Sequence, residues 1–151
     1  MKKIDLTKLD KVTLLEIKCS ENYFLSPNSL KNISLKKECN FQFKDSNISS
    51  RIVYRTVAQK DVEIDLKITL SSIEENVKNI DVFLEIYILN LDESNNISIK
   101  PFLEIPQKEI KFEHKVTIGA PNENWIAYLK SRGLTYNQAL KLISQSFITG
   151  Q

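Results

Sequence analysis

Three side chains of this sequence could take part in nucleophilic, redox or metal chemistry: Cys19, Cys39 and the only histidine, His114. The cysteines form no CxxC pair, and neither lies close in sequence to the histidine. Structural zinc sites and redox sites need two or more such ligands at short spacing. We therefore expect two reduced, partly buried thiols and no zinc or redox motif.

His114 lies in a stretch, 110–118, in which every second residue is apolar. Successive side chains of a strand point to opposite faces, so His114 should face inward with its apolar neighbours, and Glu113 should face outward. A lone inward histidine usually holds a backbone carbonyl or a water. The sequence therefore predicts that His114 is buried.

Strands are the elements that must position His114. From about Val12 to Ile118 the dominant pattern is alternation of apolar and polar residues with many β-branched side chains, and it is clearest over 62–70. The segment 80–91 is apolar in both phases, which predicts a strand covered on both faces. Further strands are predicted at 12–18, 39–43, 51–57 and 97–105. We find no internal repeat of fixed period, and a β-sandwich, a barrel and a β-solenoid all fit the pattern.

The last thirty or so residues carry helix signals instead. Asn122 and Thr135 are predicted N-caps, and Gly133 is a predicted left-handed stop between two short helices. Trp125 is expected to anchor the first helix in the core. We therefore expect one domain, with a β body over 1–120 and a helical segment over 121–151 packed on it.

Composition excludes several functional classes. A chain of 151 residues with 42% hydrophobic residues can form one core. Its net charge of +2, with lysines spread along the chain, gives no case for nucleic acid. No apolar run is long enough for a membrane helix or a signal peptide, which predicts a cytoplasmic protein without membrane partners. There is also no phosphate-binding glycine loop or nucleophile motif, so we do not expect an enzyme.

The stretch from Lys100 to Ile148 resembles the carboxy-terminal signature of the SufB/SufD family of iron–sulfur cluster assembly proteins. The matching elements, in order, are Lys100-Pro101, Leu103-Glu104-Ile105, His114, Thr117, Gly119, Tyr128-Leu129, Ser131-Arg132-Gly133, Ala139 and Phe147. The resemblance implies a mainly β fold: a shortened right-handed β-helix, or β-solenoid, with two short C-terminal α-helices. The family's amino-terminal helical region and several coils are expected to be missing.

The resemblance also implies a function. Family members assemble with an ABC-type ATPase, and their terminal helices form its docking surface. The corresponding candidates here are Tyr128, Lys130, Arg132, Gly133 and Tyr136, although Arg132 and Gly133 also fit a purely structural role at the helix end. His114, with Glu113, is the candidate for handling sulfur or the cluster.

One departure from the family pattern limits this function. Ile86 stands where SufB-like members carry their sulfur-accepting cysteine, and an isoleucine can neither accept persulfide sulfur nor ligate iron. We expect no cofactor in the isolated chain, and an iron–sulfur cluster only in a complex, with His114 the only candidate ligand. The alternative is a non-catalytic β-solenoid binding or regulatory paralogue that has lost cluster assembly. An open solenoid end usually has to be covered, so we expect a homodimer or pairing with a longer SufB/SufD relative.

Overall fold

The structure is a computed structural model that describes residues 2–26, 29–72, 77–104 and 110–150. The chain forms a β-solenoid of about three turns followed by two helices. The fold class expected from the sequence is therefore confirmed, whereas a sandwich and a barrel are not observed. Ile105, part of the family signature above, lies outside the described residues.

The elements follow one another in a strand-rich order that ends in helices. They are β1 (Lys2–Asp5), the short 3-10 helix η1 (Leu6–Lys8), β2 (Val12–Ile17), β3 (Tyr23–Ser26), β4 (Ser29–Leu30), β5 (Ile33–Phe43), β6 (Ile48–Ala58), β7 (Val62–Ser72), β8 (Ile80–Asn90), β9 (Asn96–Glu104), β10 (Ile110–Gly119), α1 (Glu123–Ser131) and α2 (Tyr136–Thr149). Every strand predicted from the sequence is present. The short elements β1, η1, β3 and β4 were not predicted.

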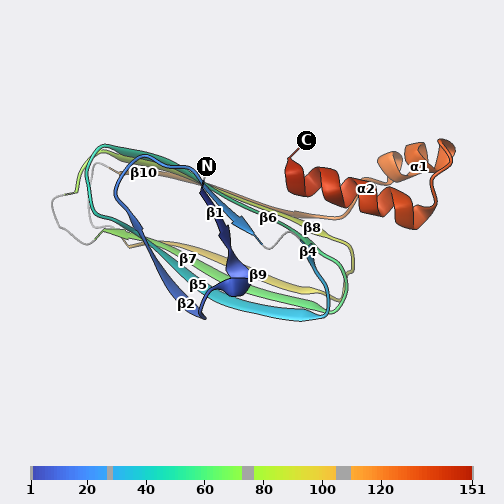
Figure 1. The fold of residues 1–151 in the computed structure, drawn as a ribbon, viewed down its shortest axis with the longest axis horizontal. Coiled ribbons are helices and arrows are strands. Elements are labelled where there is room, and N and C mark those ends of the chain that lie inside the picture. Colours follow the sequence, from blue (N-terminus) through green and yellow to red (C-terminus); the bar gives the residue numbers. More distant parts are fainter. Residues whose placement is uncertain (1, 27–28, 73–76, 105–109, 151) are drawn as a thin grey trace.

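Two parallel sheets face one another across the core (Figure 1). Sheet A has the order β1-β3-β6-β8-β10, with β4 beside β6, and sheet B has the order β2-β5-β7-β9. From β5 onward the chain alternates between the sheets, so each coil adds one strand to each sheet. Equivalent residues pair about one coil apart, as Ile33 pairs with Val62 in sheet B and Ile48 with Ile80 in sheet A.

The core lies between the inner faces of the two sheets. Leu66 and Ile68 from sheet B and Leu84 and Ile86 from sheet A are all fully buried, in the phase that the alternation predicts. Burying an aliphatic side chain of this size contributes about 1.5–3 kcal/mol, so a few stacked coils supply a stable core. The outer face of β8 is covered only in part, because Leu89 lies beneath the helices whereas Tyr87 stays half-exposed.

The corners of the coils contain an internal repeat that we did not find in the sequence. Asn32, Asn47, Asp61 and Asn79 all have positive φ angles, between 50° and 59°, and each directly precedes a long strand. Asparagine and aspartate tolerate this left-handed conformation best among residues with a side chain. The following residues are Ile or Val and then Ser, Asp or Glu. The motif recurs at irregular intervals of 15, 14 and 18 residues, so it has no fixed period and does not contradict the sequence analysis, which found no repeat of fixed period.

The two ends of the solenoid differ. At the amino-terminal end, η1 places Leu6 over the core with no exposed surface, so that end is closed. At the other end, no strand in the described part of the chain pairs with the free edges of β9 and β10. There the inner-face residues Val116 and Ile118 are 39% and 45% exposed. The core is therefore capped at one end and open at the other.

The helix signals predicted from the sequence are confirmed. The side chain of Asn122 accepts a hydrogen bond from a first-turn amide at 2.9 Å, and Thr135 forms a capping box with Gln138. Gly133 has φ +95°, and the amide of Leu134 donates to the Leu129 carbonyl at 3.2 Å. Such a six-to-one bond beside a left-handed glycine ends a helix sharply. The turn therefore fixes α1 against α2.

A small second core joins the helices to the solenoid. It contains Val57 and Leu89 from the outer face of sheet A and Ile126 and Ile143 from the helices. The helices consequently lie beyond one end of the strands, on the side of sheet A (Figure 1). Among the described residues, no helix is both long and apolar enough to cross a membrane.

Candidate functional site

His114 lies on the inner face of β10, where it pairs in register with Leu84 of β8. The face is the one that the sequence predicts, but the predicted burial is wrong, because His114 is exposed. No further coil follows β10 among the described residues, so nothing covers this end of the inner face. The Phe112 ring stacks on the imidazole with centroids 5.6 Å apart. Glu113 points to the outer face and forms an ion pair with Lys111 at 2.9 Å, so Glu113 and His114 lie on opposite faces.

The position expected to carry a thiol is close to His114 in the ladder. Ile86 pairs with Val116 and therefore lies one inner-face step along β8 from Leu84, the partner of His114. Its side chain is fully buried. The position at which the resemblance implies a cysteine is therefore close to His114 on the inner face of sheet A. In this chain that position holds only an aliphatic side chain.

The two cysteines lie elsewhere in the fold. Cys39 is buried in β5 of sheet B, paired with Ile68, and burial raises the pKa of its thiol to about 11. Cys19 is exposed after β2, and desolvation, followed by nearby Glu21, raises its pKa. Within the described ranges, no group of His, Cys, Asp and Glu residues could hold a metal ion.

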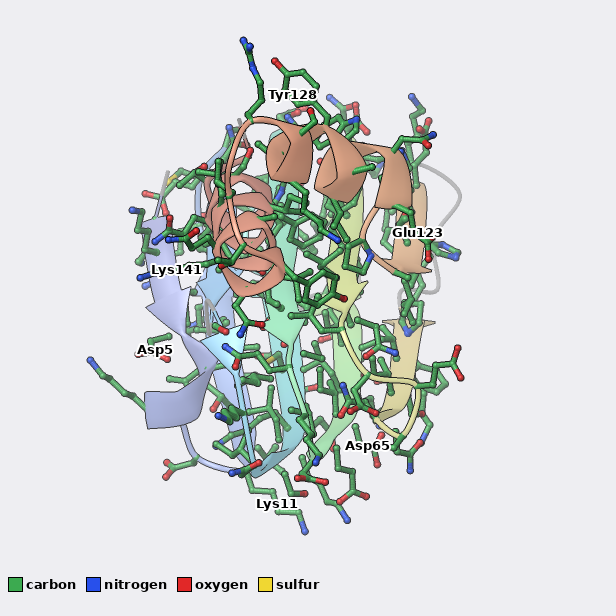
Figure 2. All side chains as sticks on the ribbon, turned by 90° about the vertical axis from the view of Figure 1, so that its right-hand side faces the viewer. Asp5, Lys11, Asp65, Glu123, Tyr128 and Lys141 are labelled. Atoms are coloured by element: carbon green, nitrogen blue, oxygen red, sulfur yellow. The ribbon has the colours of Figure 1, made fainter. Side chains whose placement is uncertain are left out.

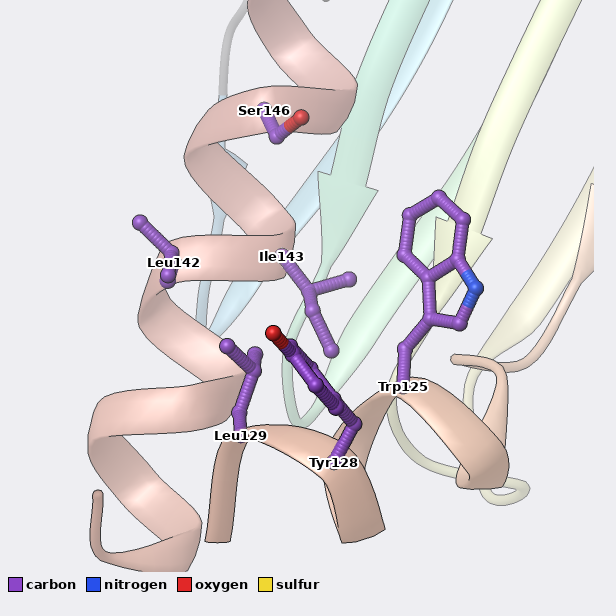
Figure 3. Close-up of a pocket in the computed structure, with 6 residues that line it drawn as sticks. All are labelled: Trp125, Tyr128, Leu129, Leu142, Ile143 and Ser146. Carbon is purple, nitrogen blue, oxygen red and sulfur yellow. The ribbon is translucent and has the colours of Figure 1, made fainter. Parts of the chain in front are cut away.

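A second candidate site is an apolar groove between α1 and α2. Its volume is about 450 Å³, and it is lined by Trp125, Tyr128, Leu129, Leu142, Ile143 and Ser146 (Figure 3). The expectation that Trp125 anchors the core was wrong, because this side chain is 61% exposed. On α1 it is the next residue, Ile126, that faces the solenoid. Trp125 therefore points into the groove instead.

The docking residues expected from the resemblance are spread over two surfaces. The Arg132 guanidinium lies 5.7 Å from the centre of the Tyr128 ring, and Tyr128 projects at the top of the helical segment in Figure 2. Lys130 is exposed on the same helix, and Gly133 forms the turn. Tyr136, 53% exposed, lines a separate hollow of about 500 Å³ beside Ile118.

Sequence reasoning missed several groove residues. Leu142 and Ser146 are four residues apart on α2, and Trp125, Tyr128 and Leu129 share one face of α1. This i, i+3, i+4 spacing is a recognisable signal. Trp125 was assigned to the core, and Leu142 and Ser146 were given no role, because a sequence does not show that the helices project beyond the sheets.

Together, the parallel coils, the open end and the exposed helix pair define a β-solenoid scaffold with a helical appendage. A family model described as the SUF system FeS cluster assembly, SufBD core domain, matches residues 29–147. The chain therefore belongs to the SufBD core domain family, which supports a role in iron–sulfur cluster assembly. A comparison with curated proteins found no match.

Proposed function

We propose that this chain is a scaffold or partner subunit in iron–sulfur cluster assembly, and that the helix pair docks an ABC-type ATPase. In this proposal ATP hydrolysis belongs to the partner, the cluster is the cargo, and the chain itself is not an enzyme. The cytoplasm is the location that we propose for the assembly.

The observation that carries the docking proposal is the exposed apolar groove of the helix pair. Trp125 and Tyr128 are 61% and 59% exposed at its rim. Large aromatic side chains that pack into a partner commonly dominate the energy of an interface. The Gly133 turn and the second core hold the two helices in a fixed arrangement, which lowers the cost of ordering the surface on binding.

The test is a binding measurement between the purified chain and the ABC-type ATPase of the SUF system from the same organism. We expect Tyr128→Ala and Arg132→Glu to weaken binding by about tenfold or more, as truncation of interface anchors usually does. A matched control is Val12→Ala, because Val12 is 56% exposed at the opposite end of the solenoid and should not contribute. If the wild-type chain does not bind the ATPase, the docking proposal is wrong.

We also propose that the open end pairs with a second SufBD-type subunit, either another copy or a longer relative. Free strand edges and exposed inner-face residues favour such pairing. His114 would then lie at or near the junction between the two subunits, and a thiol from a longer relative would have to supply the function that Ile86 cannot.

A second candidate function is that of a binding or regulatory paralogue that no longer assembles a cluster. The buried aliphatic side chain of Ile86 near His114 favours it, as does the location of both cysteines away from β10. Reconstitution with iron and sulfide separates the candidates. A cluster that forms in a complex and is lost with His114→Ala supports the scaffold, whereas ATPase binding without any cluster supports the paralogue.

A further inference from the structure

The outer face of sheet A carries a cluster of cations around an aromatic ring that belongs to neither of the two apolar cores. It consists of Arg51 and Arg55 from β6, Glu85 and Tyr87 from β8, and Lys115 from β10, and we call it the Tyr87 cluster. Tyr87 pairs with Arg55, and Glu85 pairs with Lys115, so the cluster occupies adjacent positions on three neighbouring strands.

Glu85 holds part of this cluster in place. Its side chain is only 6% exposed, although it lies on the outer face. One carboxylate oxygen accepts a hydrogen bond from Nε of Arg51, and the other accepts one from the Tyr87 hydroxyl at 2.7 Å. The Arg51 side chain itself stays 56% exposed. A satisfied polar network of this kind is rigid, so the guanidinium is presented to solvent in a fixed position.

Two further cations converge on the same ring. The Arg55 guanidinium carbon lies 4.8 Å, and the Lys115 ammonium 5.5 Å, from the centre of Tyr87. Arg55 also donates to the Phe147 carbonyl at 3.3 Å. In the described part of the chain neither cation has a carboxylate within ion-pair distance. Each cation therefore lies beside the Tyr87 ring without a neutralising carboxylate from the described residues, and a bound anion would supply one.

The outer face of sheet B is different. There, lysines and carboxylates form ion pairs across neighbouring strands, for example Lys67 with Glu38 at 3.1 Å and Lys100 with Asp65 at 3.2 Å. That pattern is typical of a solvated surface. Sheet A also has outer-face ion pairs, Arg51 with Glu85 and Lys111 with Glu113, but Arg55 and Lys115 take part in neither. The half-buried rings of Phe24 and Phe83 pair in register with Val53 and Arg51, next to these cations. Rings combined with arginine are typical of protein interfaces.

We propose that the Tyr87 cluster binds an acidic peptide segment of a protein partner. Carboxylates of that segment pair with Arg55 and with Lys115 on either side of the Tyr87 ring, and apolar side chains of the same segment cover Phe83 and Phe24. Charge complementarity favours this occupant, because the cluster has three cations and a single carboxylate that is already fully used. Charge-assisted hydrogen bonds to a carboxylate supply both strength and orientation. The cluster shares no residue with the helix groove, so it adds a second contact surface beyond the proposed ATPase docking.

The test uses the full chain labelled with ¹⁵N and titrated with a synthetic decapeptide of alternating Glu and Leu. We expect the amide signals of the outer-face residues of β6, β8 and β10 to shift. Lys115→Gln should weaken binding about fivefold or more, as removal of an exposed charge-assisted contact does. The matched control is Lys67→Gln, because Lys67 lies 5.2 Å over the Phe102 ring on the outer face of sheet B.

Three results would overturn the proposal. One is the absence of shifts around Tyr87, and another is an equal loss of affinity in both lysine variants. The third is equal binding of inorganic phosphate, which would identify a small-anion site instead of a peptide surface. A peptide with Gln in place of Glu should not bind. Lys115→Gln changes one exposed side chain, so its spectrum should remain that of a folded protein and the comparison stays informative.

Discussion

The side chain of Glu85 shows how a buried charge is tolerated on the outside of a sheet. Removing a carboxylate from water is costly unless its oxygens are hydrogen-bonded. Arg51 and Tyr87 provide those bonds, and the bond from Arg51 is the main reason that the pKa of Glu85 lies below its ordinary value of 4.5. The ionised form is therefore stabilised in the folded state relative to the unfolded chain.

This arrangement predicts a specific pH dependence of stability. A carboxylate with a lowered pKa contributes stability above its unfolded pKa, and the contribution is lost as the pH falls through the folded pKa. Glu85→Gln should therefore lower the free energy of unfolding by about 1 kcal/mol at pH 7, since Arg51 is half-exposed and the pair is screened. The difference in the free energy of unfolding between the wild-type chain and Glu85→Gln should shrink as the pH falls below 4.5. Urea unfolding at several pH values measures it, and a constant difference would contradict the assignment.

Individual side chains also show the limit of sequence reasoning at this scale. Alternation correctly predicts that His114 shares a face with Val116, because strand geometry is local. It does not predict exposure, which depends on whether another coil lies beyond β10. Trp125 illustrates the same limit on a helix. Its spacing fits a core position, but the exposure of a helix face is set by where the helix projects.

At the scale of elements, the corner residues determine where each strand begins. The left-handed corners let the chain turn from one sheet to the other without glycine. Two corner residues are also hydrogen-bonded between coils: the side-chain amide of Asn79 donates to the side-chain oxygen of Asn47 at 2.8 Å. The corner is therefore both a backbone feature and a link between successive coils.

A pair of substitutions at Asn79 tests this role. Asn79→Val places a β-branched residue at φ 55°, and strain of this kind costs about 1–3 kcal/mol. Asn79→Gly adopts the conformation freely and loses only an exposed hydrogen bond, so it should cost about 1 kcal/mol or less. Thermal unfolding of both variants gives the comparison. Equal destabilisation would mean that the side-chain bond, and not the backbone conformation, is the important feature.

The elements differ in how far their sequences specify them. The helix boundaries were predictable because Asn122, Thr135 and Gly133 act within one turn of their own position. The long strands were predictable from their period of two. The short strands β1, β3 and β4 lack enough residues for a period to appear, and they form by pairing with strands distant in sequence.

For the whole molecule, the main feature is the difference between the two ends of the core. Leu6 covers the core at the amino-terminal end, so a second subunit that bound there would bury little additional apolar surface. At the other end, burial of Val116 and Ile118 and pairing of the free edge of β10 would both stabilise an assembly. β1 and β2 are edge strands as well, but the core behind them is closed by Leu6. A molecule whose core is open at one end forms a closed pair more readily than an extended filament. The shortening that the resemblance implies predicts an open end without specifying which, whereas the closure by η1 and the position of the open end could only be seen in the fold.

This asymmetry leads to the last prediction. We expect the isolated chain to sediment as a dimer at tens of micromolar, and Val116→Lys to sediment as a monomer, because a lysine on the inner face of β10 would be buried unpaired in the interface. Val12→Lys is the matched control: it makes the same change at an exposed valine on β2, at the closed end, and should leave the dimer intact. Two observations would contradict the prediction: a monomeric wild-type chain, or dissociation by Val12→Lys alone. The first would mean that the open end waits for a different subunit, and the second would place the interface at the amino-terminal edge.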